Sequence, residues 1–196
     1  MGQQPASQCV QAKPAATICD VRMIRQPHDQ NGRSIMLESV AIRRAETVDV
    51  ESIGRVASEV GASGGIESDL VAGLFDDPAV FTYLAEVDDT FGFVTAGHPM
   101  DADVYDKGVG EIIGLAVLPR FRCFGIGSKL LVHGLTVLKL RGYLRAAAWL
   151  PDAEPRSREL FERLRFTSTG MSRAVNHPSG RTIEQSSFEV GLDDYF

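Results

Sequence analysis

The sequence predicts one mixed α/β domain in which about four helices flank a mostly antiparallel sheet of about seven strands. Three observations support this fold class. Strand-like and helical segments follow one another in the order β-α-α-β-β-β-α-β-α-β-β between about residues 39 and 191. A length of 196 residues suits one domain with its own core. Apolar residues at 44% and charged residues at 23% are ordinary for a globular chain.

The N-terminal part differs in composition from the rest. It mixes Gln, Pro, Ala, Ser, Asn and Gly without a sustained hydrophobic period, which favours a partly disordered extension. A short strand over residues 18–24 is an option within it. We therefore divide the chain into an N-terminal extension, residues 1–37, and one globular domain, residues 38–196.

The first half of the domain is predicted to hold three strands and two helices. Val50, Ile53 and Val56 recur at helical spacing, and the later segments are rich in β-branched and aromatic residues. In chain order we expect a strand over 39–45, a helix capped by Thr47 or Asp49, a second helix over 68–75, and a hairpin of strands 80–86 and 91–96.

The second half is predicted to begin with a loop over 97–110 and to alternate strands with helices. Residues 111–118 are apolar on both faces, as a buried central strand requires. Leu130, Leu131, Leu135 and Leu138 define the inner face of the next helix. The expected elements are a helix over 127–140, a strand over 144–150, a helix over 155–164, and a strand pair 166–175 and 183–190 around a turn at 176–180.

A glycine-containing turn, Arg122-Cys-Phe-Gly125-Ile-Gly127, joins the central strand to the helix that follows. Glycine has no Cβ, so the main chain at such a turn can approach an anion closely. The first N–H groups of a helix also favour negative charge, and Arg122 adds a cation. The turn therefore predicts a pyrophosphate site on backbone amides, with Arg120 as a helper. The alternative is a pair of glycines that serves only turning and packing.

The pattern Arg-x-x-Gly-x-Gly and the element order resemble the GNAT superfamily of N-acetyltransferases. The resemblance implies acetyl-CoA as the co-substrate, no metal, and an acetyl group passed directly to an amine. It also implies that the central strand pairs with the pantetheine arm. The cofactor-binding residues implied in this way are Leu115, Val117, Pro119, Arg122, Cys123, Phe124, Gly125, Ile126, Gly127, Ser128 and Phe161.

Two residues of the central strand are the catalytic candidates. The spacing Glu-x-x-x-Leu-Ala-Val resembles the histone-type branch of the family, which implies Glu111 as general base, and Val117 supplies the amide for the oxyanion. An amine with a pKa near 10 is mostly protonated at neutral pH, so a base must remove a proton before attack. The alternative for Glu111 is a solvated carboxylate at a strand end. Glu86 and His98 are weaker candidates for the base.

The last helix departs from the family pattern. Residues 154–166 are similar to Asn-x-x-Ala-x-x-x-Tyr-x-x-x-Gly-Phe, but Glu154, Phe161 and Arg165 replace Asn, Tyr and Gly. Phenylalanine cannot protonate the departing thiolate, a contribution of roughly 10²–10⁴-fold. Water or Ser157 could substitute. Two hypotheses follow: an active N-acyltransferase, and a degenerate acyl-CoA sensor or scaffold. A generic nucleotide turn for ATP or NAD is disfavoured, since both P-loop and dinucleotide motifs are absent.

Charge and composition restrict the partners. A net charge of −6 argues against a general nucleic-acid binder and is compatible with cationic amines. The sequence has neither a long apolar run nor a signal peptide, so we expect a cytoplasmic protein without a membrane contact. The expected partner is an amine-bearing small molecule or protein, with a homodimer as an option. Acids that could steer a cationic amine are Asp88, Asp89, Asp101, Asp103, Asp106 and Glu111.

Overall fold

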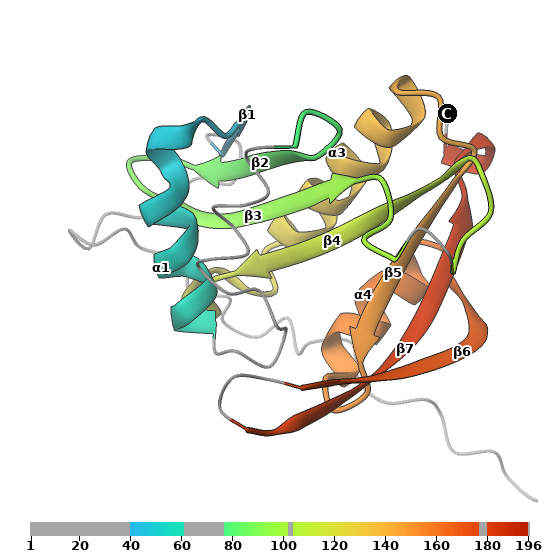
Figure 1. Ribbon diagram of the computed structural model, residues 1–196. Coiled ribbons are helices and arrows are strands. Elements are labelled where there is room, and N and C mark those ends of the chain that lie inside the picture. The colour runs from blue at the N-terminus through green and yellow to red at the C-terminus, as the bar shows by residue number, and fades with distance from the viewer. Residues whose placement is uncertain (1–39, 61–76, 102–103, 177–179, 196) are drawn as a thin grey trace, which may run out of the picture.

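The computed structural model describes residues 40–60, 77–101, 104–176 and 180–195. Within these ranges, seven strands form one sheet in the order β1-β2-β3-β4-β5-β7-β6 (Figure 1). The strands are β1 Ala41–Arg44, β2 Phe81–Glu86, β3 Thr90–Gly97, β4 Val109–Val117, β5 Arg145–Pro151, β6 Thr167–Asn176 and β7 Thr182–Gly191. All neighbours pair antiparallel except β4 and β5, which are parallel. The predicted fold class is confirmed.

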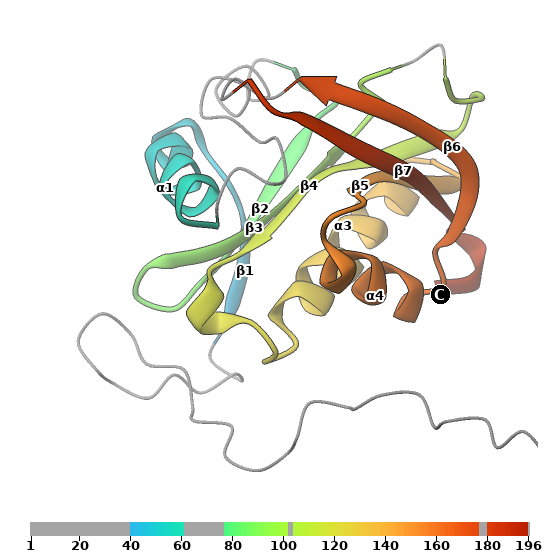
Figure 2. The same cartoon turned by 90° about the horizontal axis from the view of Figure 1, so that it is seen from below.

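Helices cover both faces of this sheet (Figure 2). Helix α1, Val50–Val60, packs on β3 and β4 from one side, whereas α3, Ile126–Leu140, and α4, Pro155–Arg163, lie on the other. Short 3₁₀ turns complete the described chain: η2 Thr47–Asp49, η4 Pro119–Phe121 and η5 Asp193–Tyr195. The helix expected over 68–75, the strand option at 18–24 and the extension 1–37 lie outside the described residues.

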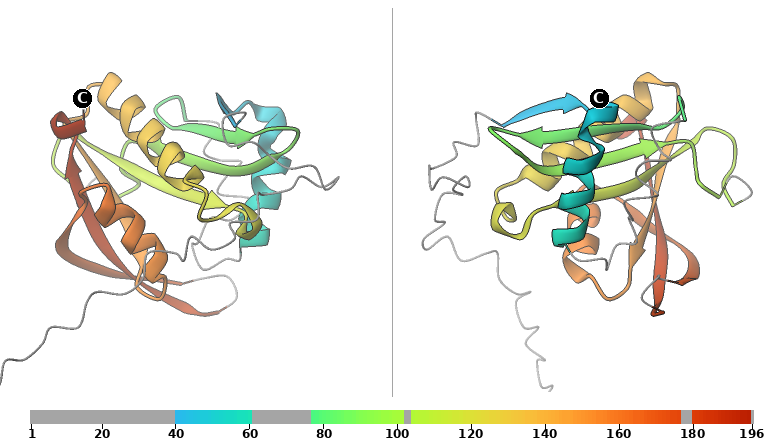
Figure 3. Two further views of the ribbon diagram at one scale, coloured as in Figure 1. Left: turned by 180° about the vertical axis from the view of Figure 1, so that it is seen from behind. Right: turned by 60° about the vertical axis from the view of Figure 1, so that its left-hand side comes forward.

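The core joins buried residues of the sheet, α1 and α3, and α3 lies along the sheet (Figure 3). The leucines predicted for the inner face of this helix, Leu130, Leu131, Leu135 and Leu138, are all fully buried. Gly134 lets the helix approach closely, because a Cβ there would lie 3.1 Å from Val94 and 3.3 Å from Ile112. The helical period of the leucines therefore fixes which face of α3 meets the sheet.

The sheet opens in its middle, between β4 and β5 (Figure 1). The two strands pair only from Val109 to Glu111, opposite Arg145 to Ala147. Beyond that point β4 continues beside β3, and β5 continues beside β7. Ile113 is an extra residue in the β3–β4 ladder, and such a bulge bends the strand that carries it. We call the space between the diverging strands the gap.

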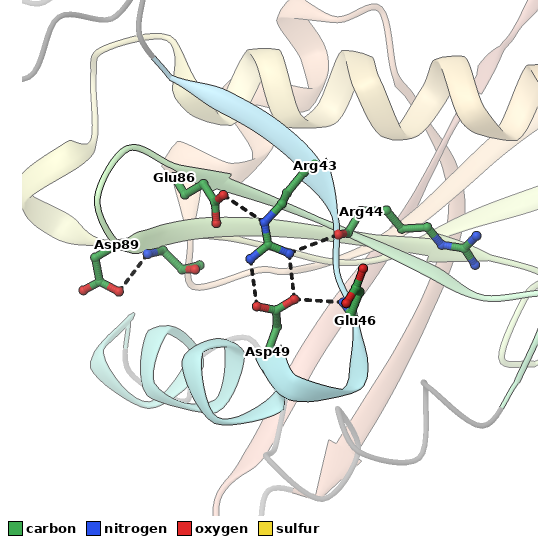
Figure 4. A network of polar contacts seen from close by, with 7 residues as sticks. Arg43, Arg44, Glu46, Asp49, Glu86 and Asp89 are labelled. Carbon is green, nitrogen blue, oxygen red and sulfur yellow. Dashed lines mark hydrogen bonds and ion pairs between the residues drawn. The ribbon is translucent and has the colours of Figure 1, made fainter.

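An ion-pair network fastens the β1 edge of the sheet to the start of α1 (Figure 4). The Arg43 guanidinium donates to both oxygens of Asp49 at 2.8 Å and, through Nε, to Glu86 at 2.8 Å. Asp49 is 7% exposed and also accepts the Glu46 N–H. The N-cap is therefore Glu46 and neither of the two predicted residues, although Asp49 takes part as the N3 residue of the capping box. The Arg43 guanidinium holds the pKa of Asp49 below its usual range.

Replacing Asp49 with asparagine is expected to lower the free energy of unfolding at pH 7 by about 1–3 kcal/mol, because Arg43 loses its charged partner. A depressed folded-state pKa gives stability that is present above pH ~4 and lost as the pH falls through that pKa. The difference in free energy of unfolding between the variant and wild type should therefore become smaller at acidic pH. Urea unfolding at pH 7 and pH 3 measures it.

The control for this prediction is Asp193→Asn. Asp193 has an 89% exposed side chain and lies 3.8 Å from Lys139, so its loss should cost well under about 1 kcal/mol. Equal losses in the two variants would contradict the structural role of the Arg43–Asp49 pair.

Candidate functional site

Backbone groups of β4 line one side of the gap. The Leu118 N–H donates to the Phe91 carbonyl of the β3 flank at 2.9 Å. Alternate residues of a strand direct their backbone groups to the same side, so the amides of Val117 and Leu115 face away from β3, toward the gap. The Val117 carbonyl, on the same side, accepts from Arg122 Nε at 3.1 Å. Beyond Glu111 this edge of β4 is therefore paired with no other described strand, and an extended ligand can add to it.

The predicted phosphate turn follows the far end of β4 and leads into α3 (Figure 3). Gly125 is the N-cap of the helix with φ +78°, a left-handed conformation that favours glycine. Gly127 packs closely on α4, because a Cβ there would lie 3.3 Å from the end of the Leu160 side chain, which would have to shift slightly. The two glycines therefore do serve turning and packing. They also leave the first N–H groups of α3 at the end of the gap, without partners inside the helix.

The arginines and the cysteine of this turn have different surroundings. Arg122 is half-buried and bonded to Val117, so its guanidinium lies between the turn and the strand. Arg120 instead pairs with Glu59 of α1 at 2.9 Å. The Arg120 side chain is therefore tied to α1 and not to the turn. Cys123 is exposed and has φ +66°.

Glu111 lies on β4 where the gap begins, and it is only 3% exposed. The alternative of a solvated strand-end carboxylate is therefore wrong. Its carboxylate accepts the Met100 N–H at 2.8 Å. Burial raises the pKa of Glu111, although the Met100 N–H, Arg173 and His98 act in the opposite direction. A carboxylate with a raised pKa near a strand opening is suited to accept a proton at neutral pH.

Only some of the other predicted acids and bases lie near Glu111: the charges of His98 and Asp101 act on its carboxyl, whereas Glu86 and Asp89 have partners elsewhere. Glu86 is bonded to Arg43, at the hairpin end of β2. His98 Nδ1 lies 3.6 Å from the Asp77 carboxylate. Three of the acids are ion-paired with arginines: Asp89 with Arg55, Asp106 with Arg145, and Asp101 with Arg173. Asp88 is exposed, and Asp103 lies outside the described residues. The described acids therefore form no continuous acidic mouth.

A polar cluster that the sequence did not indicate lies beside Glu111. Arg173 of β6 stacks on Trp149 of β5, with its Cζ 4.3 Å from the ring centroid, and donates from Nε to Gln185 at 2.8 Å. Next to them, the Tyr105 hydroxyl bonds with Ser187 at 3.1 Å. Burial raises the pKa of Tyr105 to about 12, so its hydroxyl stays protonated. Met171 and Val175, two residues to either side of Arg173, are apolar and share its face of the strand, which is the signal that could have placed Arg173 there.

The residues of and beside α4 that replace the family's signature residues have contacts and backbone conformations that the sequence did not indicate. Phe161 is 3% exposed, and its ring packs edge-on against Phe166 with centroids 4.8 Å apart. The Ser157 hydroxyl donates to Glu154 at 3.1 Å. Arg165 adopts φ +63°. Its N–H donates to Glu162, and the Phe166 N–H donates to Phe161, which together form a Schellman motif whose left-handed position favours glycine.

Replacing Arg165 with glycine is expected to raise the free energy of unfolding by about 1 kcal/mol, because the left-handed conformation costs an L-residue that much. Arg163→Gly is the matched control: it removes the same side chain two residues earlier, in the last helical turn, and should destabilise by up to about 1 kcal/mol. Urea unfolding of both variants checks the pair. A loss of stability in both variants would contradict the claim that Arg165 is strained in its left-handed conformation.

No helix in the described ranges is long and apolar enough to cross a membrane. A family model described as the acetyltransferase (GNAT) family matches residues 58–166, more than half of the chain. No curated protein sequence matches.

Many solved structures share the fold. An N-acetyltransferase from Staphylococcus aureus Mu50 superposes with a TM-score of 0.65 at 19% identity, over 78% of this chain and 98% of that one. YncA, a putative acetyltransferase from Salmonella typhimurium with its cofactor acetyl-CoA, gives 0.64 at 19% identity, over 79% and 94%. NAA60 from Arabidopsis thaliana in complex with acetyl-CoA gives 0.66 at 16% identity, over 79% and 99%. The fold implied by the resemblance is confirmed.

Proposed function

The chain belongs to the GNAT family of acetyltransferases, and from this premise we propose that it transfers an acetyl group from acetyl-CoA to an amine by direct attack. The observation that carries the proposal is the position of the buried Glu111 at the opening of the gap, with the glycine turn at the opposite end of the same strand. A base and a turn suited to anions, on a strand whose edge is unpaired between them, suit a long cofactor that ends in a reactive carbonyl. Two structures of the same fold hold acetyl-CoA.

The cofactor would lie along β4. Its pyrophosphate would bind the backbone amides of the turn, residues 123–128, with Arg122 as the cation. The pantetheine arm would pair with Leu115 and Val117 in the manner of an added strand and pass Pro119. The side chain of Ile126 is buried, so this residue would contribute its N–H alone, and the buried Phe161 ring would contribute apolar packing.

The chemistry needs one proton transfer before attack and one after it. Glu111 lies six residues before Val117, roughly 20 Å along an extended strand, so it would take a proton from the substrate ammonium group through a chain of water molecules, and the freed amine would attack the thioester carbonyl carbon. The Val117 amide would stabilise the oxyanion of the tetrahedral intermediate. Collapse of the intermediate would break the carbon–sulfur bond and release the CoA thiolate, which takes, through water, the second proton that the attacking nitrogen loses as the amide forms. A thiol with a pKa near 8.5 can leave without a positioned acid, so Phe161 slows the step without preventing it.

A thiol-release assay with acetyl-CoA and a panel of amines tests the proposal. We expect release that saturates with acetyl-CoA and depends on the amine. The second candidate, an acyl-CoA sensor, is favoured by Phe161 at the position of the usual tyrosine and by the engaged Ser157 hydroxyl. It predicts saturable acetyl-CoA binding, measured by calorimetry, without release above the rate of hydrolysis.

A further inference from the structure

Arg173 lies on the same face of the sheet as Glu111, at the opening of the gap. Glu111 is opposite Ala147 in the last paired position of β4 and β5. Trp149 is the next residue of β5 on that face, and the Arg173 guanidinium stacks on its ring. Arg173 is also opposite Gln185 in the β6–β7 ladder. The charge of Arg173 acts on the Glu111 carboxyl, which places the two groups within electrostatic reach of each other.

The guanidinium is held in one orientation. Gln185, which is buried, accepts from its Nε at 2.8 Å, and the Trp149 ring lies 4.3 Å below its central carbon. Its Nη1 donates to Asp101. Among the described residues these contacts use two of the five N–H groups that a guanidinium carries. A preorganised guanidinium is suited to bind a carboxylate with little further loss of side-chain entropy.

The partners of Arg173 belong to different parts of the structure. Gln185 and Trp149 belong to the sheet, whereas Asp101 lies in the loop after β3 and has a 48% exposed side chain. The cluster also contains a donor in excess: the Trp149 indole N–H is buried without an acceptor among the described residues. Such a group favours a ligand that brings oxygen atoms. Asp101 therefore contacts the Arg173 guanidinium from the solvent side, where another carboxylate can replace it.

We infer that the acceptor is an amine that also carries a carboxylate, as an amino acid does, and that Arg173 binds this carboxylate in place of Asp101. The inference rests on the proposed acetyl transfer. In this arrangement the amine lies at Glu111 and the carboxylate at Arg173, on the same face of the sheet. A polyamine, which brings a second cation, would be repelled by Arg173.

The test compares amino acids with their primary amides, with the amine and the carboxyl carbon separated by one, two or three carbons. For one of these lengths, wild type should favour the acid over the amide by more than about tenfold in kcat/KM. Arg173→Gln should raise KM for that acid by about 10- to 100-fold and leave KM for the amide unchanged. Asp101→Asn should lower KM for the acid, because it removes the competing carboxylate. Arg145→Gln is the control: Arg145 lies opposite Val109, where β4 and β5 are still paired, its guanidinium is engaged by Glu189 at 2.8 Å, and its loss should leave the preference intact.

Equal kcat/KM values of wild type for acids and amides would overturn the inference. An Arg173→Gln variant whose kcat/KM falls equally for the acid and the amide would also overturn it. A rise in KM for the acid in Asp101→Asn would show that the Arg173–Asp101 pair has only a structural role. If no amine supports thiol release, acetyl transfer itself fails, and calorimetric titration of the same acids into the CoA-bound protein decides the inference. Binding to wild type that is absent in Arg173→Gln supports it, and absence of binding to wild type overturns it.

Discussion

Replacing Glu111 with glutamine is expected to lower kcat by about 10²–10⁴-fold, the contribution of a positioned general base. Glutamine keeps the size of the side chain and an oxygen that can accept the Met100 N–H, so the loop after β3 stays in place. What is lost is the capacity to take a proton from the substrate ammonium group. Steady-state kinetics at saturating acetyl-CoA measures the effect.

The same substitution is expected to stabilise the fold at neutral pH. Burial raises the pKa of Glu111, so the folded state prefers the protonated form. Stability from such a group is fully present below its unfolded pKa near 4.3 and is lost as the pH rises through the folded value. Glutamine is neutral throughout, so the gain in Tm of the variant over wild type should grow across this window and then remain constant.

Glu189→Gln is the matched control for both effects. Glu189 lies on β7 opposite Ala147, one strand beyond Glu111, and its carboxylate is engaged by Arg145 at 2.8 Å. Its loss should leave kcat within about twofold of wild type and should not raise Tm, because it removes one partner of an ion pair. A Glu111→Gln variant with wild-type kcat would remove Glu111 from the mechanism. A lower Tm in that variant would contradict the cost assigned to its buried charge.

Replacing Arg122 with alanine is expected to raise KM for acetyl-CoA by about 10- to 100-fold, which is the usual effect of losing one charged hydrogen bond. Arg122 lies between the glycine turn and the Val117 carbonyl, where a pyrophosphate would meet its guanidinium. The effect should be smaller for a CoA fragment that lacks the pyrophosphate. Competition of such fragments with acetyl-CoA measures this difference.

Arg120→Ala provides a control two residues away in the same segment. Its guanidinium pairs with Glu59 of α1 at 2.9 Å and lies over the Phe121 ring, so it should affect the attachment of α1 more than the affinity for acetyl-CoA. A KM change as large in Arg120→Ala as in Arg122→Ala would show that general positive charge, and not the position of Arg122, matters at this turn.

Local patterns were sufficient to predict most of the fold. The leucine period of α3, the doubly apolar β4 and the turn between them each depend on neighbours within about ten residues, and each is confirmed. The opening between β4 and β5 could not be read from these patterns. It depends on a bulge at Ile113 and on a parallel pairing of only three residues, both of which are set by distant strands.

The site was predictable only in part, for the same physical reason. Glu111 could be chosen by its spacing, but its burial depends on the loop that brings the Met100 N–H to it. Arg173 lies 62 residues further along the chain, and only the β5-β7-β6 order of the sheet places it over Trp149. The acids of the turns looked like one cationic-substrate mouth, yet Asp89, Asp101 and Asp106 are ion-paired with arginines from other elements.

A crystal structure with acetyl-CoA bound tests the central claim most directly. We expect the pyrophosphate on the amides of residues 123–128 beside Arg122, the pantetheine arm along Leu115 and Val117 in the gap, and the thioester carbonyl within hydrogen-bond distance of the Val117 amide. Glu111 should lie on the side from which an amine can reach the carbonyl carbon. A cofactor bound elsewhere, or one whose thioester points away from Glu111, would contradict the proposed site.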